Sequence, residues 1–358
     1  MFRKLLAHRT KRGRRYQRSP DSGADIMATA EEIGLKQAEA LEAELEALEE
    51  PGGPPPNPTR TDAALGEPFV VCQNLVKIYK VDELEVFALQ GLDLEIKRGE
   101  LMAIIGSSGS GKSTLLNVLG GLDTPTAGRA YVAGWDLLRM SNRARVLFKR
   151  RTVGFVWQSV SRNLVPYLSA LENVELPMIL NGTFNRNRAK ELLSAVGLER
   201  RMRHKPMHMS GGEQQRVAIA IGLANNPSVL LADEPTGSLD SRTGNTILRV
   251  FREVRDIFGV TVIVVTHDRG MADAVDRFVE IRDGKTSTEA VRREAESLSE
   301  DSHDQYTLLD SAGRLQLPLS YVESLGLQGP SRVRLTVDGH RIVIEPPDGA
   351  PSLDEEPA

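Results

Sequence analysis

Cysteine is almost missing from this chain of 358 residues, because Cys72 is its only thiol. A single thiol excludes an internal disulfide and suits a reducing compartment. Positive charge is not in excess either: 45 Lys and Arg face 49 Asp and Glu, so the net charge of −4 gives no global attraction to nucleic acid. The remaining composition, 40% hydrophobic and 26% charged, is ordinary for a soluble folded protein.

Long hydrophobic runs are also missing. The longest, around Val260–Val265, has the length of a strand, whereas a membrane-spanning helix needs ~20 apolar residues. The N-terminus carries basic residues without the apolar stretch that a secretory signal requires. If the protein works with a membrane component, we therefore expect that component to be a separate chain.

Residues 1–66 have a composition unlike that of a folded core. Met1–Arg18 contains eight Lys or Arg and no acid, Glu31–Glu50 contains eight Glu and one Lys, and Pro51–Pro58 is rich in proline. This composition predicts a disordered tail with one marginal helix and a Pro-rich linker. Two alternatives are open: the basic run anchors to anionic lipid headgroups, or Met27 is the true start of the protein.

Residues 67–286 carry the patterns of one folded domain. Phe69–Lys77 and Leu84–Ile96 alternate apolar and polar residues, which predicts half-exposed antiparallel strands. Three continuously apolar segments predict parallel strands buried on both faces by helices: Leu101–Ile105, Val229–Ala232 and Val260–Val265. The fold class is therefore α/β with an antiparallel β-subdomain.

A helical insertion is predicted between these strands. Leu164–Gly222 has mainly helical periodicity, and Pro166, Pro177 and Pro206 are expected to lie in loops between its helices.

The strand Leu101–Ile105 leads into a complete phosphate-binding loop. The segment Gly106-Ser107-Ser108-Gly109-Ser110-Gly111-Lys112-Ser113 has the pattern Gly-x-x-x-x-Gly-Lys-Ser. Its glycines let backbone N–H groups turn toward the β- and γ-phosphates, Lys112 adds a positive charge, and the Ser113 hydroxyl is suited to Mg²⁺. The helix predicted over Lys112–Leu119 directs its N-terminal dipole at the same place. This P-loop predicts a nucleoside triphosphate site that extends from Gly106 to Thr114.

A second apolar strand ends in two carboxylates, in Val229-Leu230-Leu231-Ala232-Asp233-Glu234. Asp233 is expected at the strand end beside the P-loop, where it would bind Mg²⁺ through water. Glu234 would polarise the water that attacks the γ-phosphate, a role that contributes ~10²–10⁴-fold in rate. The alternative is a structural carboxylate pair that caps the turn before Pro235.

A third motif narrows the class of nucleotide-binding protein that the sequence indicates. Ser210-Gly211-Gly212-Glu213-Gln214 precedes a helix predicted over Glu213–Ala224, so it forms another anion site at a helix N-terminus. Together with the P-loop, at this spacing, it resembles the ATPase subunit of ATP-binding cassette (ABC) systems. The resemblance covers residues 69–285 and implies a P-loop NTPase fold, ATP and Mg²⁺ as ligands, and ATP hydrolysis.

The resemblance also implies roles for single residues. Gln158 matches the residue that contacts Mg²⁺ and water, His267 the histidine that binds the γ-phosphate, and Tyr79 the aromatic on which adenine stacks. Ser238-Leu239-Asp240 matches the loop through which two subunits contact each other. Ser210 and the following glycines would close over ATP held by a partner subunit, in a head-to-tail homodimer. Taken singly, each of these residues also fits a surface or capping role.

Within the family, four stretches look most like the MacB, LolD and FtsE subgroup: Ile105–Gly121, Leu171–Pro177, Gly211–Ala220 and Thr236–Gly244. That likeness implies a separately encoded permease of the MacB, FtsX or LolC type, mechanotransmission or export, and a peripheral location at the cytoplasmic face of the inner membrane. Two stretches depart from it. Gln158–Asn163 is longer than in the lipoprotein-releasing type, and Ile221-Gly222 stands where the subgroup usually has Arg-Ala.

The C-terminal part is predicted as a linker over 287–304, a small β-rich domain over 305–347 and an acidic tail over 348–358. The middle segment resembles the AbrB/MazE swapped-hairpin domain over about 40 residues. Shared features are the Asp310–Arg314 turn, the strand end at Leu317-Pro318 and a final hairpin turned at Asp338-Gly339. In that family two chains interleave their hairpins, since so short a segment buries too little alone.

We hypothesise that this segment holds two ATPase subunits together. The alternatives are a monomeric β-rich appendage or a DNA-binding domain. Four Arg against four acidic residues in Tyr306–Pro347 argue against a DNA surface.

Rival functions for the whole chain are an ABC protein of DNA repair or translation, which usually carries two cassettes, and an ATP-controlled DNA-binding regulator. A metal pair at His204 and His208 is not predicted, because Pro206 between them prevents a shared helical face.

Overall fold

The computed structural model describes residues 68–81, 84–292, 303–309, 313–317, 319–324, 333–339 and 341–345. These residues all belong to one compact unit, Pro55–Ala358. The predictions for the N-terminal tail, residues 1–66, and for the acidic tail, residues 348–358, lie outside the described residues. None of the described helices is both long and apolar enough to cross a lipid bilayer.

An antiparallel sheet forms the first layer of the fold. Its four strands are β1 (Pro68–Val81), β2 (Leu84–Lys97), β4 (Ala127–Val132) and β5 (Trp135–Asp136), in the order β2-β1-β4-β5. The alternation in β2 buries Leu89, Leu92, Leu94 and Ile96 and leaves most residues between them exposed or half-buried. The predicted antiparallel β-subdomain is thus confirmed.

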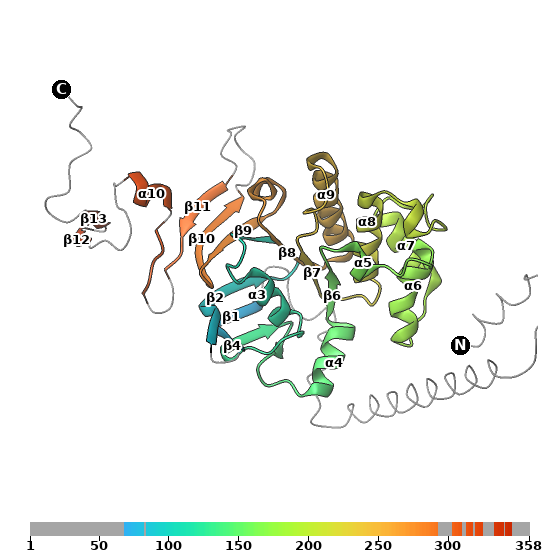
Figure 1. Cartoon of the computed structure of the whole chain (residues 1–358), viewed down its shortest axis with the longest axis horizontal. Helices are drawn as coiled ribbons and strands as arrows, with labels where there is room; N and C mark the ends of the chain where they lie inside the picture. Colours follow the sequence, from blue (N-terminus) through green and yellow to red (C-terminus); the bar gives the residue numbers. More distant parts are fainter. Residues whose placement is uncertain are drawn as a thin grey trace, which may run out of the picture. The chain divides into compact units, whose positions relative to one another are not determined.

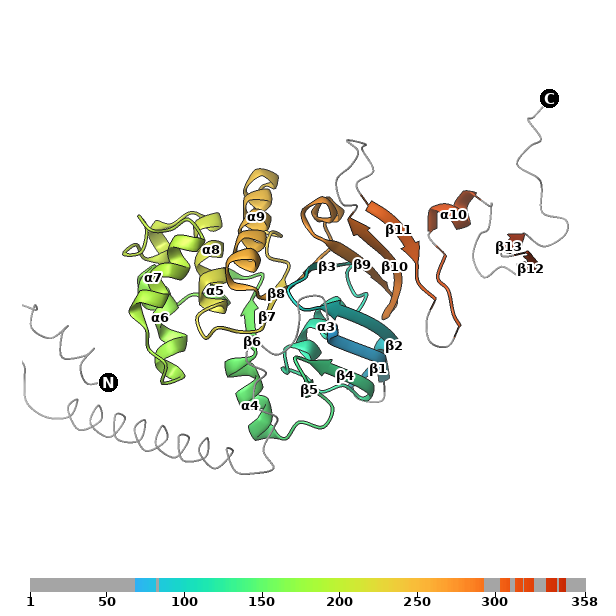
Figure 2. The same ribbon diagram turned by 180° about the vertical axis from the view of Figure 1, so that it is seen from behind.

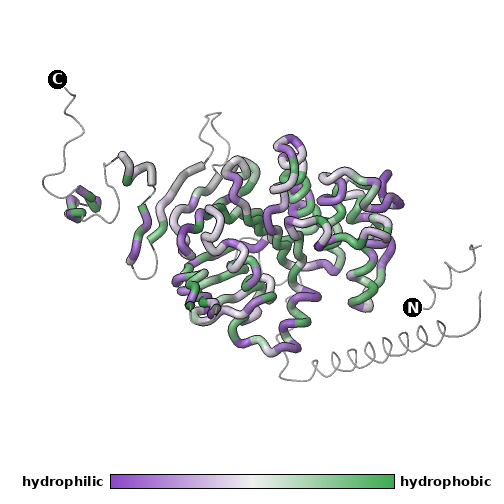
Figure 3. The backbone as a smooth tube through the Cα atoms, viewed as in Figure 1, coloured by the Kyte–Doolittle hydropathy of each residue, from purple (hydrophilic) through white to green (hydrophobic). Residues whose placement is uncertain are grey.

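The central sheet has seven strands in the order β11-β10-β9-β3-β8-β7-β6. The strands are β3 (Leu101–Ile105), β6 (Val153–Val156), β7 (Val229–Asp233), β8 (Thr261–Thr266), β9 (Arg277–Arg282), β10 (Lys285–Arg292) and β11 (His303–Thr307). The five from β6 to β9 are parallel, and β10 and β11 add an antiparallel edge. Every residue of β3 and β8 is buried, as their continuous apolar runs predict. Figure 3 shows the hydrophobic colour concentrated in these central strands.

The described helices lie between and after these strands in the sequence. They are α3 (Lys112–Leu119), α4 (Asn142–Arg151), α5 (Val160–Asn163), α6 (Ala170–Leu180), α7 (Arg186–Ala195), α8 (Gly211–Gly222), α9 (Ser241–Phe258) and α10 (Leu319–Ser324), with short 3₁₀ turns at Pro206–His208 and Arg269–Ala274. In both ribbon views α6, α7 and α8 form one group and β1, β2 and β4 another, with central strands between them (Figure 1, Figure 2). Val174, Leu192 and Ile219 of the helical group share one apolar core with Ala103 and Val264 of the sheet.

The loop prediction for Pro177 is wrong, because Pro177 lies inside α6. Proline removes one backbone donor, and a helix tolerates that loss when packing supports it. The N-terminus of α6 is closed by a capping box between Ser169 and Glu172, and Val174 and Met178 are buried on the core side. These interactions hold the helix across the proline.

The linker prediction over 287–304 also differs from the structure at its described residues, 287–292 and 303–304, which lie in strands. Residues 285–292 form β10, which pairs with β9 on one side and β11 on the other. Thr286, Ser287 and Thr288 are buried, and the hydroxyls of the first two donate to the carbonyls of Asp93 and Glu280, at 3.1 and 3.2 Å. Hydroxyl groups satisfied in this way let a polar sequence enter a sheet.

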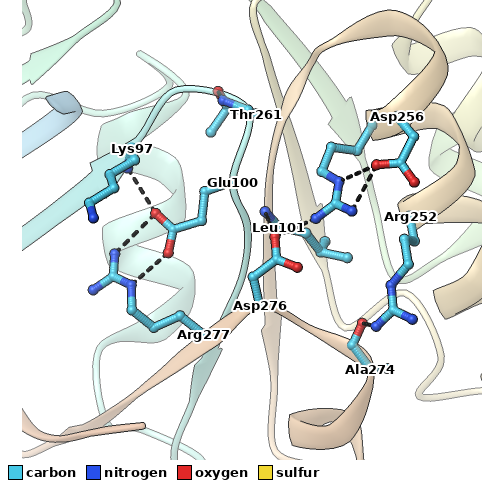
Figure 4. Close-up of polar contacts among 11 residues, drawn as sticks. Lys97, Glu100, Leu101, Arg252, Asp256, Thr261, Ala274, Asp276 and Arg277 are labelled. Atoms are coloured by element: carbon cyan, nitrogen blue, oxygen red, sulfur yellow. Dashed lines mark hydrogen bonds and ion pairs between the residues drawn. The ribbon is translucent and has the colours of Figure 1, made fainter. Parts of the chain in front are cut away.

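A polar network joins the amino ends of the central strands (Figure 4). Glu100 accepts hydrogen bonds from Arg277 Nε at 2.6 Å and from the Lys97 N–H at 2.8 Å. Asp276 accepts from the Leu101 N–H at 3.0 Å and from the Arg255 guanidinium. These contacts fix where β3 and β9 begin, at the edge opposite the P-loop.

Described residues of the C-terminal segment form α10 and a hairpin of β12 (Arg334–Asp338) and β13 (Arg341–Glu345). The hairpin turns at Asp338-Gly339, and Gly339 has a positive φ of 58°. Val337 and Ile342 face each other across the strands and are 79% and 73% exposed. A C-terminal β-rich region is present, and its likeness to the AbrB/MazE domain stays a prediction.

Candidate nucleotide-binding site

The P-loop connects β3 to α3, and its glycines have a steric cause. Gly109 and Gly111 have φ of +79° and +101°, in the left-handed region that favours glycine. A Cβ at Gly106 would lie 2.3 Å from the Ile281 carbonyl oxygen, and one at Gly111 would lie 2.4 Å from the Ala88 carbonyl oxygen. No side chain caps the N-terminus of α3, so its N–H groups are left for an anion.

Lys112 is folded back into this loop. Its Nζ donates to the carbonyl oxygens of Gly106 and Ser107, at 2.8 and 2.7 Å. Burial lowers the pKa of Lys112, while the carboxylates of Glu234 and Asp233 act to raise it. Beside it the Ser110 hydroxyl is buried and makes no hydrogen bond within the described part of the chain. An unsatisfied hydroxyl and a loop of glycine N–H groups are the donors that a polyphosphate needs, so the loop fits ATP.

Oxygen ligands for Mg²⁺ lie next to Lys112. Ser113 Oγ donates to Asp233 Oδ1 at 3.3 Å, which places a hydroxyl and a carboxylate oxygen together at the carboxyl end of β7. Burial raises the pKa of Asp233, and the hydrogen bond from Ser113 opposes that rise. Within the described ranges no three His, Cys, Asp or Glu residues are grouped to hold a metal ion. These two oxygens therefore fit an ion that takes its remaining ligands from phosphate and water.

Glu234 adopts an unusual backbone conformation at the end of β7. Its φ is 46°, in the left-handed region, which costs a non-glycine residue about 1–3 kcal/mol. Its N–H donates to the Val265 carbonyl of the neighbouring β8 at 2.9 Å. The carboxylate Oε2 lies 2.9 Å from His267 Nδ1 and accepts a 3.3 Å hydrogen bond from Thr266 Oγ1. The left-handed turn thus ends the strand alternation and directs the Glu234 carboxylate toward His267.

A cavity of about 860 Å³ brings most of the predicted residues together. Its lining comprises Tyr79, Ser107, Ser108, Gly109, Gly111, Lys112, Ser113, Thr114, Gln158, Glu234 and His267, together with Val86, Phe87 and Ala88. The last three were not predicted as site residues, because they belong to no nucleotide-binding motif. The pairing of Tyr79 with Val86 in the β1–β2 ladder brings them to the site.

The Ser210–Glu213 segment lies elsewhere in the same chain. Ser210 caps α8: its Oγ accepts from the Glu213 N–H at 3.3 Å, and Glu213 Oε2 accepts from the Ser210 N–H at 2.8 Å. That backbone hydrogen bond lowers the pKa of Glu213. None of these residues lines the described cavity. They lie instead beside the start of α9, since a Cβ on Gly212 would be 2.5 Å from Thr243 Cγ2.

Asp240 caps the N-terminus of α9. Its carboxylate accepts from the Thr243 N–H at 3.0 Å and from the Thr243 hydroxyl at 2.6 Å. The two predicted dimer-contact segments, Ser210–Glu213 and Ser238–Asp240, are therefore neighbours, and Ser210 and Asp240 are exposed.

Comparisons with known proteins agree with this geometry. A family model described as ABC transporter matches residues 89–237. An uncharacterized ABC transporter ATP-binding protein of Thermotoga maritima is 51% identical over 212 residues, which are 58% of this chain and 89% of that protein. The lipoprotein-releasing system ATP-binding protein LolD of Xylella fastidiosa is 44% identical over 231 residues, 64% of this chain and 95% of LolD. The site defines an ATP-binding cassette, and the chain belongs to the ABC transporter family as its ATPase subunit.

Longer relatives and solved structures extend the comparison. The macrolide export ATP-binding/permease protein MacB of Brucella melitensis is 45% identical over 232 residues, and this chain spans 35% of its length. The dimeric structure of MJ0796, a bacterial ABC transporter cassette, matches with a TM-score of 0.57 and 42% identity, over 63% of this chain and all of that one. A second MJ0796 structure is a post-hydrolysis dimer bound to ADP and Pi. These proteins match the cassette and give no support for the AbrB-like resemblance.

Proposed function

We propose that this ATPase works as a head-to-tail homodimer whose two subunits each complete the other's nucleotide site. One observation carries the proposal. Lys112, Ser113 and Glu234 line one cavity, whereas Ser210, at a helix N-terminus built for an anion, is exposed outside it. An exposed helix N-terminus is open to an anion from another molecule, and the triphosphate held by a second copy would supply one. The dimeric cassette with 42% identity supports this arrangement.

The chemistry proposed for the site follows from its contacts. Lys112 and the P-loop N–H groups would hold the phosphates, and Ser113, with Asp233 and Gln158 nearby, would hold Mg²⁺, which would supply positive charge to the phosphates. Glu234 accepts a proton from the attacking water, and the His267 imidazole at 2.9 Å orients its carboxylate and contacts the γ-phosphate. Tyr79, which lines the same cavity, stacks on adenine.

A mixing experiment tests the shared site. Lys112→Ala and Ser210→Arg proteins should each be inactive in single-turnover ATP hydrolysis. Mixed together, they form dimers in which one site combines the intact Lys112 with the intact Ser210, so hydrolysis should return. Retained ATP binding by the Ser210→Arg protein is the folding control. If the mixture stays as inactive as its components, the two residues do not act across a dimer interface.

We further propose that the dimer drives a separate membrane permease, from the cytoplasmic face of the membrane. LolD and MacB are named for lipoprotein release and macrolide export, and the cassette's identity to both supports a permease of the LolC, FtsX or MacB type. The test of this partner is whether the full-length protein co-purifies with membranes. This co-purification should be lost when the permease is deleted.

The C-terminal region is proposed to hold the two subunits together. The β12–β13 hairpin is two-stranded, and such a hairpin is marginally stable without further packing. Its exposed Val337 and Ile342 offer an apolar surface to a second copy, and tethering raises the effective concentration of subunits toward ~mM. Truncation after Ser324 removes this hairpin and leaves β10 and β11 in the sheet. Sedimentation of the truncated Glu234→Gln protein without ATP should show fewer dimers than the full-length Glu234→Gln protein, and an equal dimer fraction would contradict the tether.

A further inference from the structure

A carboxylate outside the known motifs holds two side chains of β1. Asp123 lies just beyond α3, and its Oδ2 accepts a hydrogen bond from the Tyr79 hydroxyl at 2.8 Å. Its Oδ1 forms an ion pair with Lys77 Nζ at 2.6 Å and accepts from the Thr124 N–H at 2.7 Å. Lys77 and Tyr79 are two residues apart on β1, and both side chains reach the same carboxylate.

Lys77 also constrains the aromatic ring directly. Its Nζ lies 4.7 Å from the centroid of the Tyr79 ring and donates to the Thr124 carbonyl at 2.9 Å. The Lys77 side chain is 11% exposed, and a partly desolvated ammonium attracts an aromatic face. The ring is therefore held at its hydroxyl by Asp123 and near its face by Lys77, while Tyr79 still lines the nucleotide cavity.

The charge states of the two groups keep this contact strong. Burial raises the pKa of Tyr79 and the hydrogen bond to Asp123 raises it further, while a hydrogen bond with the side chain of Thr114, near the start of α3, acts to lower it. Burial also acts to raise the pKa of Asp123, but hydrogen bonds from Lys77 and Tyr79 outweigh it and the pKa is lowered. At neutral pH a neutral phenol thus donates to an ionised carboxylate, which is a charge-assisted hydrogen bond.

The same loop is joined to the strand by backbone contacts. The Thr126 N–H donates to the Val76 carbonyl at 2.8 Å, and Thr126 Oγ1 accepts from the Ile78 N–H at 3.0 Å. The P-loop begins α3 at Lys112, and the loop that holds Tyr79 follows the end of α3 at Leu119. The helix α3 thus connects the P-loop to the loop that holds Tyr79.

We infer that Asp123 and Lys77 are positioning residues that fix the Tyr79 ring for the base of the nucleotide, at a set distance from the P-loop. The inference rests on the proposed stacking role of Tyr79. Neither Asp123 nor Lys77 is among the residues that line the described cavity, so their removal should change recognition of the base and leave recognition of the triphosphate unchanged.

The test compares equilibrium binding of ATP and of inorganic tripolyphosphate, which has no base, to full-length proteins. Asp123→Asn and Tyr79→Phe should each weaken ATP binding by about five- to ten-fold, the net effect of one typical intramolecular hydrogen bond. Asp123→Asn should bind tripolyphosphate as the unmodified protein does, whereas Tyr79→Phe, which also loses the contact of its hydroxyl with Thr114, should lose more affinity for ATP than for tripolyphosphate. Asp123→Asn should have a smaller effect in the Tyr79→Phe background than alone, because the two residues share one interaction. Asp136→Asn is the matched control and should leave both affinities unchanged. It removes a carboxylate of the same sheet that accepts a hydrogen bond from the Leu138 N–H at 3.0 Å, in a turn.

Two results would overturn the inference, and they are distinguishable. If Asp123→Asn and Tyr79→Phe keep the normal ratio of ATP to tripolyphosphate affinity while Tyr79→Ala lowers it, Tyr79 stacks on the base without help from Asp123. If Tyr79→Ala keeps the ratio as well, the stacking role itself fails. Because Tyr79→Phe retains the ring, it remains informative even if Asp123→Asn unfolds.

Discussion

Replacing Glu234 by Gln is expected to lower ATP hydrolysis by about 10²–10⁴-fold while ATP binding is retained. The amide cannot accept the proton of the attacking water, but it keeps the size of the side chain and an oxygen for Thr266 and His267. Phosphate release measures the first effect and equilibrium ATP binding the second. With Mg²⁺ and ATP the variant should accumulate as a closed dimer, because closure no longer leads to hydrolysis.

Glu253→Gln is the matched control for this variant. Glu253 is an exposed residue of α9, and the same change of charge there should leave turnover unchanged. Normal hydrolysis in the Glu234→Gln protein would remove Glu234 from the catalytic role, whatever its contacts.

Replacing Lys112 by Ala is expected to weaken ATP binding by on the order of 10²-fold or more. The ammonium is buried and directed into the P-loop by the Gly106 and Ser107 carbonyls, and each hydrogen bond from a charged group contributes about 1.5–3 kcal/mol. Titration calorimetry with ATP measures the loss. The exposed Lys149 of α4 provides the control, because Lys149→Ala removes the same charge away from the cavity. An affinity equal to that of the unmodified protein would show that Lys112 does not bind the phosphates.

The sequence predicts the phosphate end of this site well, for local reasons. A continuous apolar run defines β3, and a glycine-rich segment allows one loop geometry before α3, so both elements have the bounds that the sequence predicts. Asp233 is likewise placed correctly at the end of its strand, since a parallel strand directs its carboxyl end to the ligand edge of the sheet.

The aromatic end could not be predicted in the same way. Asp123 lies 44 residues from Tyr79 in sequence and belongs to no motif that would mark it as its partner. Val86 and Phe87 reach the cavity only through the register of β1 against β2. Contacts set by tertiary pairing leave no local pattern, so the residues that position the Tyr79 ring are visible only in the structure.

The structure also gives a physical account of Gly222, which departs from the usual residue of the LolD and MacB subgroup. A Cβ at Gly222 would lie 2.8 Å from Leu230 Cδ1, and a Cβ at Gly154 would lie 2.2 Å from the Gly222 carbonyl oxygen. The end of α8 therefore lies close to Leu230 of β7 and to Gly154 of β6. The sequence alone shows that Gly222 replaces the usual residue of the subgroup, but it does not show these close contacts.

The most direct measurement of the proposed dimer is a structure of the Glu234→Gln protein with ATP and Mg²⁺. We expect Ser210 Oγ of one protomer to lie about 3 Å from a γ-phosphate oxygen of the nucleotide that Lys112 of the other protomer holds. A structure in which Ser210 is distant from every triphosphate, in its own protomer and in its neighbour, would contradict the shared site and with it the proposed cycle of closure and hydrolysis.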